Sequence, residues 1–459
     1  MSVAVDAALR PSTPSQDYLE PPEVVEPSPQ WAPTRSLGRA VFLCGLLLIA
    51  GALLGRVDLV VLGAPFAIGT AYALRRRPQA SPRIRLGTDD THHVEGAELT
   101  AGVQIGNRDV VGYDLVVVRM LISPWLKVEK ADRPHALTVA RGGETEIEMA
   151  GEALRWGRHA LGPASARVTA CDGLIASRPA VSGARGVRVY PMTDPFDADE
   201  AMPSAAGLVG NHRSRRPGEG GELAGVRIFG PGDRLRRVDW RVSLRTDRLH
   251  VAATLSDRDA EVVLLLDLLA EAGRSGGVKG SASVLDTTVR SAAAIAEHYL
   301  HRGDRVSLLE YGPGARRLRP ATGRRQYLTV LEWLLDVRVE DSGHEPYEHV
   351  FGSQVLSHNA LVVVLTPLVD ARSAEMLARL ARSGRFVVAV DTLPASAAPP
   401  KRGPWTEVAH QMWRLERDNT IGQLRENGVP VVAWAGAGSL DLVLRDVARL
   451  ASAPKAMHR

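Results

Sequence analysis

Two uncharged apolar runs stand out near the start of the chain, separated by only three residues. They are Ala40–Gly55 (AVFLCGLLLIAGALLG) and Leu59–Leu74 (LVVLGAPFAIGTAYAL). Each run would form about 24 Å of helix, which approaches the roughly 30 Å hydrocarbon core of a bilayer. Neither run carries the polar stripe of a soluble amphipathic helix. The pattern predicts two transmembrane helices as a hairpin over residues 37–77, and the alternative is a pair of buried core helices.

Short segments of alternating polarity follow between residues 84 and 190, separated by Gly, Asn and Asp turns. The expected strands are Leu99–Ile105, Asp114–Ile122, Ala136–Ala140, Thr145–Met149, Arg155–Leu161, Ala164–Cys171 and Val187–Tyr190. Several short strands at this spacing are typical of a small β-sandwich. This β-rich module carries no catalytic constellation of residues.

Between residues 261 and 453, continuous apolar strands alternate with helices of 3.6-residue periodicity. The expected strands are Glu261–Asp267, Arg305–Tyr311, Leu361–Leu368, Phe386–Thr392 and Val429–Ala435, and the expected helices are Ala282–Leu300, Arg324–Val337, Ala371–Ser383, Glu407–Asn427 and Leu440–Leu450. This alternation predicts a doubly wound α/β domain with a parallel sheet covered on both faces. Sites in such sheets form beyond the carboxyl ends of the strands, which here carry Asp267, Gly312, Thr366 and Asp391.

Length and composition add a multidomain organisation to this picture. The chain has 459 residues, 45% of them hydrophobic and 24% charged, which excludes a wholly disordered or fibrous protein. Residues 1–36 hold seven prolines and almost no apolar periodicity, so we expect a disordered Pro-rich tail there. Two cysteines, Cys44 and Cys171, exclude a disulfide framework, and free thiols suit the reducing cytoplasm.

The distribution of positive charge predicts how the hairpin is oriented. Arginines flank it on both sides, whereas the turn between the runs holds one arginine; the flanking residues are Arg35, Arg39, Arg75, Arg76, Arg77, Arg83 and Arg85. Positively charged flanks remain on the cytoplasmic side of a membrane. We therefore expect an inner or plasma membrane protein with both termini and the soluble domains in the cytoplasm. The net charge of +4 then reflects this orientation and a second arginine cluster, and we expect no nucleic-acid partner.

That second cluster lies in the connector of residues 191–260. Between Arg213 and Arg248 there are ten arginines and five acidic residues. Arginine forks, carboxylates and the indole of Trp240 at this density favour either a fixed bidentate network or a surface that docks a partner. A third interpretation is an enzyme site for an anionic, phosphate-bearing substrate.

The connector also carries a recognisable motif, VRIFGPGDRLRRVDWRVSLRTDRLHV. It resembles the hallmark segment of the domain-of-unknown-function 58 (DUF58) family, roughly R-x-Y-x-x-G-D-x-x-R-x-I-D-W-x-x-S-A-R-x-x-x-L. The chain departs from it at Phe229, Val238 and Leu244. We take the following as motif and partner-docking residues: Glu222, which lies upstream, and the matching residues Arg227, Gly232, Asp233, Arg236, Asp239, Trp240, Ser243 and Arg245. Leu249 also matches the motif.

The resemblance implies a fold and a role for the chain. It implies that the α/β domain is von Willebrand factor A-like, and that a MoxR-type AAA+ ATPase is the partner. It further implies complex assembly or envelope-related processes. Our leading hypothesis is a non-catalytic, membrane-tethered cytoplasmic scaffold without a cofactor. The alternative is a divalent-metal-dependent ligand-binding protein.

A von Willebrand A-type metal site requires D-x-S-x-S after the first strand, where a carboxylate and two hydroxyls supply hard oxygen ligands. Here the segment reads Asp267-Leu268-Leu269-Ala270-Glu271, and leucine cannot coordinate a metal. We predict a degenerate site, with Asp267, Glu271 and Thr366 as the residues that an atypical, water-bridged cation would use.

Other metal and nucleotide patterns are set aside. His344 and His349 are five residues apart with a proline between them, so they do not share a helix face. His298 and His301 are interpreted as surface or helix-end residues. The chain lacks the G-x-x-x-x-G-K-[ST] signature of a P-loop ATPase and the G-x-S-x-G of a hydrolase. We therefore expect no catalytic residues.

Overall fold

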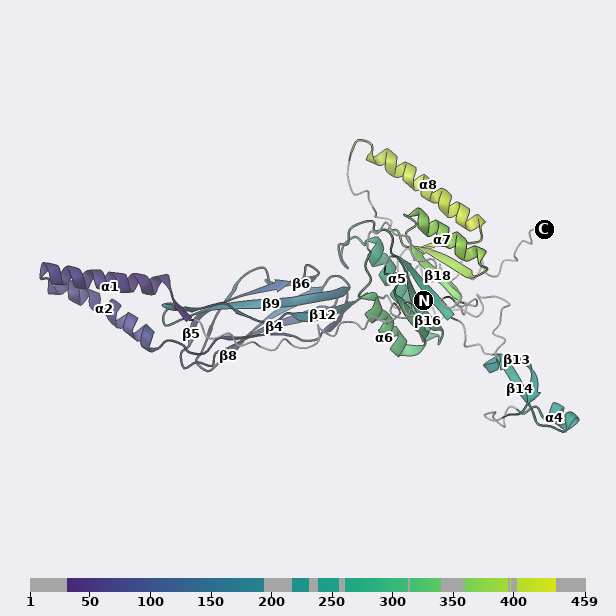
Figure 1. Cartoon of the computed structure of the whole chain (residues 1–459), viewed down its shortest axis with the longest axis horizontal. Coiled ribbons are helices and arrows are strands. Elements are labelled where there is room, and N and C mark those ends of the chain that lie inside the picture. Colours follow the sequence, from purple (N-terminus) through teal and green to yellow (C-terminus); the bar gives the residue numbers. More distant parts are fainter. Residues whose placement is uncertain are drawn as a thin grey trace, which may run out of the picture. The chain divides into compact units, whose positions relative to one another are not determined.

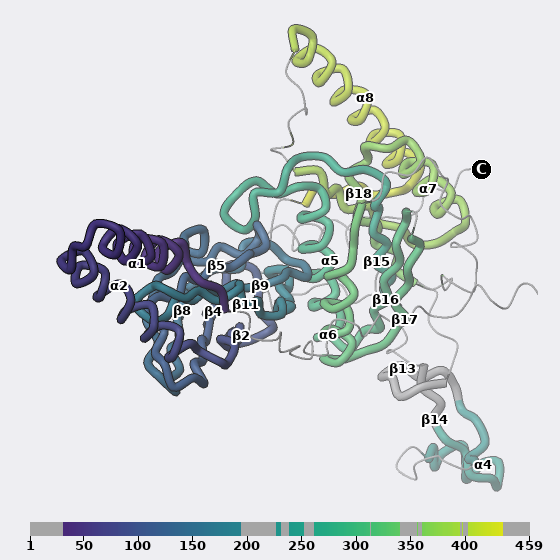
Figure 2. The backbone as a smooth tube through the Cα atoms, turned by 60° about the vertical axis from the view of Figure 1, so that its left-hand side comes forward, coloured from purple at the N-terminus to yellow at the C-terminus, as the bar shows by residue number. Residues whose placement is uncertain are grey.

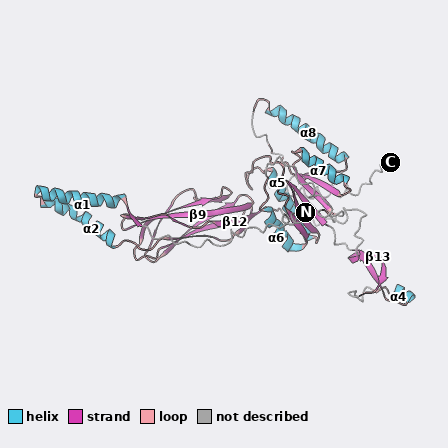
Figure 3. Cartoon of the chain, in the orientation of Figure 1, coloured by secondary structure: helices cyan, strands magenta, loops and turns pink. Residues whose placement is uncertain are grey.

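A computed structural model describes residues 31–193, 217–230, 238–255, 261–312, 314–339, 356, 360–394, 397 and 403–434. The chain divides into two compact units, Met1–Tyr190 and Pro191–Arg459. Figure 3 shows that the first unit is a helical hairpin followed by strands, whereas the second mixes strands and helices.

Two antiparallel helices, α1 (Arg35–Leu54) and α2 (Val57–Arg75), form the hairpin (Figure 1). Both are long and apolar enough to cross a membrane. They approach closely at Gly51, where an added Cβ would lie 2.9 Å from Cγ2 of Val60. Small residues allow such close packing of apolar helices. The two N-terminal apolar helices expected from the sequence are therefore present.

Two sheets form the rest of the first unit. The four-stranded sheet has the order β2-β4-β8-β6, and the eight-stranded sheet has the path β1-β10-β9-β12-β3 with β5, β7 and β11 attached. The strands are β1 (Trp31–Pro33), β2 (Arg83–Thr88), β3 (His92–Val94), β4 (Glu98–Gly106), β5 (Tyr113–Ile122), β6 (Leu126–Val128), β7 (His135–Val139), β8 (Glu144–Ala153), β9 (Gly157–Ala170), β10 (Ile175–Ser177), β11 (Ala180–Val181) and β12 (Arg185–Tyr190).

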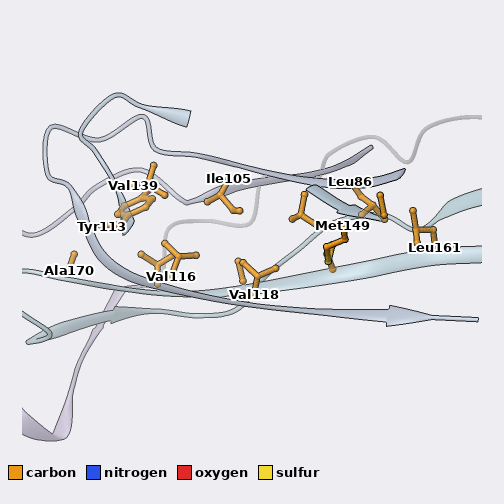
Figure 4. Close-up of a cluster of buried hydrophobic side chains, with 14 of the residues drawn as sticks. Leu86, Ile105, Tyr113, Val116, Val118, Val139, Met149, Leu161 and Ala170 are labelled. Atoms are coloured by element: carbon orange, nitrogen blue, oxygen red, sulfur yellow. The ribbon is translucent and has the colours of Figure 1, made fainter. Parts of the chain in front are cut away.

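The two sheets enclose one hydrophobic core, shown in Figure 4. Ile105 and Met149 contribute from the four-stranded sheet, and Val116 and Val118 from the eight-stranded sheet. Alternation of apolar and polar positions along each strand places one row of side chains in this core and the other in solvent. That pattern is the reason why β4, β5, β7, β8, β9 and β12 could be predicted.

Two differences from the expected elements have physical causes. Residues 31–36, assigned to the flexible tail, form β1 and the start of α1, because β1 pairs with β10 from Trp31↔Ser177 to Pro33↔Ile175. The strands expected on either side of Gly162-Pro163 form the single strand β9. A register shift in the β5–β9 pairing between Met120 and Ile122 accommodates the proline, which lacks an N–H for the ladder.

The second unit contains a six-stranded sheet in the order β17-β16-β15-β18-β19-β20. All neighbouring strands are parallel except β17, which pairs antiparallel with β16 at the edge. Its strands are β15 (Glu261–Asp267), β16 (Arg305–Tyr311), β17 (Arg317–Ala321), β18 (Leu361–Thr366), β19 (Phe386–Asp391) and β20 (Val431–Ala433). A separate two-stranded sheet pairs β13 (Pro217–Ile228) with β14 (His250–Leu255), and the short helix α4 (Trp240–Thr246) lies between these strands in the chain.

Four longer helices accompany the six-stranded sheet: α5 (Val284–His301), α6 (Gly323–Leu334), α7 (Ala371–Arg382) and α8 (Thr406–Glu426). Val263 and Leu265 of β15 share a core cluster with residues of α7 and with Leu424 of α8. Helices α5 and α6 lie side by side in Figures 1 and 2, and α5 contacts β15, β16 and β18. The mixed α/β character expected for this region is therefore present, and the helix expected at 440–450 lies outside the described residues.

Candidate functional site

The motif segment folds around a capped helix. The Asp239 side chain accepts hydrogen bonds from the backbone N–H groups of Arg241 and Val242, both at 3.1 Å, and so caps the N-terminus of α4. Aspartate is among the preferred N-cap residues because its oxygen satisfies amides that have no partner inside the helix. The carboxylate of Asp239 therefore stabilises its own segment.

Ser243 joins α4 to the neighbouring strand. Its hydroxyl donates to the carbonyl of Asp239 at 2.7 Å and accepts the N–H of His250, the first residue of β14, at 2.8 Å. The N–H of Asp239 in turn donates to the carbonyl of His250 at 2.9 Å. Ser243 is buried, so its spacing from Asp239 in the motif has a structural explanation.

The other face of α4 presents apolar and basic groups to solvent. Trp240 is 61% exposed and Leu244 is 82% exposed. These two residues are four apart, so they lie on one face of the helix, and the exposed Arg241 and Arg245 have the same spacing. Across the part of the chain that the structure describes, no ion pair joins the guanidinium groups of Arg241 and Arg245 to a carboxylate. We call Trp240, Arg241, Leu244 and Arg245 the α4 surface.

The structure describes only some of the remaining motif residues. Gly232, Asp233 and Arg236 lie outside the described residues, as does the side chain of Glu222 within β13. Arg227 is exposed on β13, and its Nη1 donates to the carbonyl of Ile228 at 3.2 Å. Of the expected docking residues, the structure thus brings together Asp239, Trp240, Ser243 and Arg245.

A second polar cluster lies at the carboxyl end of the parallel strands. Oδ2 of Asp267, at the end of β15, accepts hydrogen bonds from Oγ1 of Thr366 and Oγ of Ser373, both at 2.6 Å. Oδ1 of Asp267 accepts the N–H of Leu269 at 3.2 Å. All three side chains in this cluster are buried. Burial raises the pKa of Asp267, and the hydrogen bonds from Ser373, Thr366 and Leu269 oppose that rise.

Glu271 takes no part in those contacts. Its Oε1 accepts the N–H of Leu285 at 3.3 Å, in the first turn of α5. Among the described residues, no group of three or more His, Cys, Asp or Glu side chains is arranged to hold a metal ion. Of the three residues considered for an atypical cation, the structure therefore brings together only Asp267 and Thr366, and they bind each other. His344 and His349 lie outside the described residues.

Sequence reasoning missed several partners at this edge of the sheet. Arg417 of α8 forms an ion pair with Asp391 at 2.5 Å and donates to the carbonyl of Pro367. At the start of α7, Arg372 pairs with Asp370 at 2.7 Å, and its hydrogen bonds lower the pKa of Asp370. The strand ends were visible in the sequence as polar residues after apolar runs. The helix residues that meet them carry no such local signal.

Comparisons with known proteins agree with the motif. The family model described as "Protein of unknown function DUF58" matches residues 225–419, which confirms the family resemblance. Uncharacterized proteins of Mycobacterium bovis and Mycobacterium tuberculosis are each 34% identical to this chain over 125 residues, or 27% of this chain. The match spans 38% of the length of each relative.

Solved structures show only distant likeness. The cupredoxin domain of amoB from Nitrosocaldus yellowstonii is 11% identical, with a TM-score of 0.16 over 26% of this chain and 94% of that chain. A non-cellulosomal cohesin from Archaeoglobus fulgidus is 15% identical, with a TM-score of 0.17 over 24% of this chain and 91% of that chain. Scores this low assign neither a fold nor a function.

Proposed function

We propose that this chain, which belongs to the DUF58 family, is a non-catalytic, membrane-tethered adaptor that docks a MoxR-type AAA+ ATPase through the α4 surface. In this proposal the α1–α2 hairpin spans the inner or plasma membrane, and both soluble units are cytoplasmic. The observation that carries the proposal is the exposed pairing of an indole and a leucine with two arginines on a rigidly capped helix.

The membrane tether is supported by the many large apolar side chains that the hairpin exposes. Phe42, Leu53, Val57 and Ile68 of the hairpin are each about two-thirds exposed or more. Each exposed side chain of this size forfeits about 1.5–3 kcal/mol relative to an apolar environment. A bilayer supplies that environment, and the arginines that flank the hairpin favour its ends on the cytoplasmic side.

The strand order of the six-stranded sheet supports a von Willebrand factor A-like domain. A parallel sheet with one antiparallel edge strand, β17, and helices packed from both sides is compatible with the doubly wound architecture that the family resemblance implies. In this proposal the domain acts as a binding scaffold in complex assembly or envelope-related processes.

A non-catalytic role is supported by how the described polar groups at the carboxyl edge are used. Asp267, Thr366 and Ser373 satisfy one another, and Asp391 pairs with Arg417. Within the described residues, these groups therefore hold β15, β18 and α7 together and join β19 to α8. A catalytic acid or nucleophile needs a free position facing a substrate.

The chemistry of the α4 surface defines the partner surface it fits. Interface hot spots are enriched in Trp and Arg, with the aromatic ring seated in a desolvated pocket. Arg241 and Arg245 add positive charge beside that anchor. A partner with an apolar pocket rimmed by carboxylates is complementary to this arrangement.

The test is co-isolation of the full chain, in detergent, with the purified MoxR-type ATPase of the same organism. Trp240→Ala and the double variant Arg241→Glu/Arg245→Glu should each reduce recovery of the ATPase at least tenfold, since hot-spot truncation costs about 2 kcal/mol or more. Trp405→Ala is the matched control, because Trp405 is also a helix-terminal indole, 76% exposed. Undiminished recovery with both α4 variants contradicts the docking role.

A further inference from the structure

The chain segment that enters the hairpin is fastened to the β-rich part of the same unit. β1 pairs with β10, and the next residue, Thr34, caps α1 with its side chain. The Thr34 hydroxyl also donates to the carbonyl of Gly173 at 2.9 Å, and its N–H donates to the carbonyl of Leu174 at 2.9 Å. No unattached linker therefore precedes α1 between Trp31 and Arg35.

The segment that leaves the hairpin is fastened at the same end. The buried carboxylate of Asp109, in the β4–β5 loop, accepts the N–H groups of Gln79 and Ala80, the latter at 2.8 Å. The indole N–H of Trp31 donates to the carbonyl of Ala80 at 3.1 Å, and Arg77 donates to the carbonyl of Trp31 at 2.6 Å. Entry and exit segments are thus bound both to each other and to the loops of the sheets.

These contacts hold two loops of the β-rich part beside the helix ends. The β4–β5 loop (residues 107–112) carries Asp109, and the β7–β8 loop (residues 140–143) is joined to it. Gly142 donates its N–H to the carbonyl of Asp109 at 3.2 Å, and Asn107 donates to the carbonyl of Gly143 at 2.9 Å. In Figure 1 the hairpin adjoins this end of the strands.

The side chains at this end are suited to a charged lipid surface. Arg108 and Arg141 are exposed on the two loops, and Val110 of the β4–β5 loop is 82% exposed. Arg75, Arg76 and Arg77 are exposed at the end of α2, and the Arg76 guanidinium lies 5.1 Å from the ring centroid of Tyr72. Among the residues that the structure describes, the exposed acids at this end are Asp114, Glu144 and Asp172, so the described arginines outnumber them.

We propose that this end of the first unit, formed by Arg75–Arg77, Arg108, Val110 and Arg141, is a headgroup-binding face that rests on an anionic bilayer. The inference depends on the proposed membrane tether, because the hairpin brings the face to the bilayer surface. Arginines near a membrane bind the phosphates of anionic lipids, and an apolar loop tip enters the interface. The sequence alone placed only the arginines that flank the hairpin near the membrane, and not those of the two loops.

The experiment places a fluorophore on each end of one strand. Val110→Cys precedes β5 and Leu121→Cys, 68% exposed, lies near its other end, in a full chain in which Cys44 and Cys171 are alanine. Nine strand residues separate labels by about 30 Å. The chain is reconstituted in phosphatidylcholine vesicles with or without about 30% phosphatidylglycerol, each containing a nitroxide-headgroup lipid that quenches at short range.

We expect the Val110 label to be quenched, and more strongly when phosphatidylglycerol is present, whereas the Leu121 label is quenched in neither vesicle. Arg108→Glu/Arg141→Glu should lower the phosphatidylglycerol-dependent quenching at least about twofold. Arg119→Glu/Arg167→Glu is the matched control, because these exposed arginines lie on β5 and β9 away from the loops and should leave the quenching unchanged.

Carbonate extraction of the same vesicles separates the two proposals. A hairpin that resists extraction while the Val110 label is quenched no more than the Leu121 label overturns the headgroup-binding face and leaves the tether intact. A chain that carbonate releases overturns both. Equal quenching with and without phosphatidylglycerol overturns the preference for anionic lipid.

Discussion

At the scale of single residues, Asp267 shows how a position that resembles a metal ligand becomes structural. Burial raises the pKa of this carboxyl, and two hydroxyls and one backbone N–H surround it. Leu269 and Glu271 stand at the two positions where the metal motif would need serines, and Leu269 is buried. The polar edge of the sheet is therefore closed by hydrogen bonds among its own side chains.

Substitution of Asp267 should separate the role of its shape from that of its charge. Asp267→Ala leaves the hydroxyls of Thr366 and Ser373 and the N–H of Leu269 without their acceptor, so we expect the free energy of unfolding to fall by about 2–4 kcal/mol. Asp267→Asn keeps an acceptor and removes a costly buried charge, so its loss should be less than about 1 kcal/mol. Urea unfolding of the full chain in detergent, followed by hydrogen exchange of β15, measures both.

The sign of the pH effect gives a second check on this residue. A carboxyl whose pKa is raised in the folded state holds its proton when the unfolded chain has already lost it. The free energy of unfolding therefore falls as the pH rises through that window, from the ordinary value of 3.8 upward. Asp267→Asn should remove this part of the slope, and an unchanged slope would contradict the raised pKa.

His298 should produce a pH dependence of the opposite sign. Burial, followed by the charges of Arg302 and His301, lowers its pKa from 6.5 to about 4. Between these values the unfolded histidine binds a proton and the folded one does not, so the free energy of unfolding falls as the pH drops below 6.5. We expect His298→Leu to melt at a more constant temperature between pH 6.5 and about pH 4, the window that the two pKa values define.

The neighbouring His301 provides the control for that measurement. It is exposed, and its charge lowers the pKa of His298 less than burial and the charge of Arg302 do. His301→Leu should therefore change the slope far less than His298→Leu. Both histidines were interpreted from the sequence as surface or helix-end residues. Both lie in the last turn of α5, but His298 is buried and so is not a surface residue. The local pattern did not reveal that its helix face packs inward.

At the scale of elements, the motif segment depends on the cap of α4. A seven-residue helix is too short to be stable without its terminal contacts. Asp239 satisfies two amides at its start, and Ser243 binds it to β14. The aspartate, tryptophan and serine of the motif thus have different roles: the first and third hold the helix, and Trp240 is presented to solvent.

This division predicts how two substitutions of Asp239 differ. Asp239→Asn retains a preferred N-cap, so α4 and partner docking should remain close to those of the native chain. Asp239→Ala loses the cap, which costs about 1 kcal/mol, and should raise hydrogen exchange in α4 and weaken docking together. Hydrogen exchange measures the protection of α4, and co-isolation of the ATPase measures docking. If Asp239→Asn abolishes docking while α4 remains protected, the carboxylate charge itself contacts the partner.

The elements were predictable to the extent that their pattern was local. β15 and β16 have the bounds expected from their continuous apolar runs, because strands buried on both faces leave a clear signal. The edge strand β17 was missed, since its alternating arginines and apolar residues form a short, half-exposed pattern. The contacts of Ser373 and Arg417 could not be predicted, because they depend on which helix reaches which strand end.

At the scale of the whole molecule, the first unit joins an apolar hairpin to a pair of sheets without a free linker. The proline content of residues 1–36 indicated flexibility, yet Trp31–Pro33 is a strand and Thr34 is a helix cap. Composition averages over the whole segment, whereas the outcome at Trp31 depends on its pairing with β10 and its burial against Tyr113, with ring centroids 5.9 Å apart. A junction fastened in this way fixes the hairpin relative to the two sheets of the same unit.

Asp109 is the residue on which that rigidity should depend most. Its carboxylate accepts hydrogen bonds from Gln79, Ala80 and Val110, each worth about 1 kcal/mol. Spin labels at Leu54→Cys and Leu121→Cys, with Cys44 and Cys171 replaced by alanine, report the distance between the hairpin turn and the far end of β5. We expect a narrow distance distribution in the native background and a broad one in Asp109→Ala, measured by pulsed electron resonance.

Asp90 supplies the matched control for Asp109. It also accepts two backbone N–H groups, from Thr91 and His92, but it lies between β2 and β3, beyond the end of β2 that is remote from the hairpin. Asp90→Ala should therefore loosen its own turn and leave the distance distribution narrow. If Asp109→Ala also leaves it narrow, the pairing of β1 with β10 and the Thr34 contacts suffice to hold the junction. Addition of Thr34→Val, which removes the hydroxyl contact to Gly173, should then broaden it.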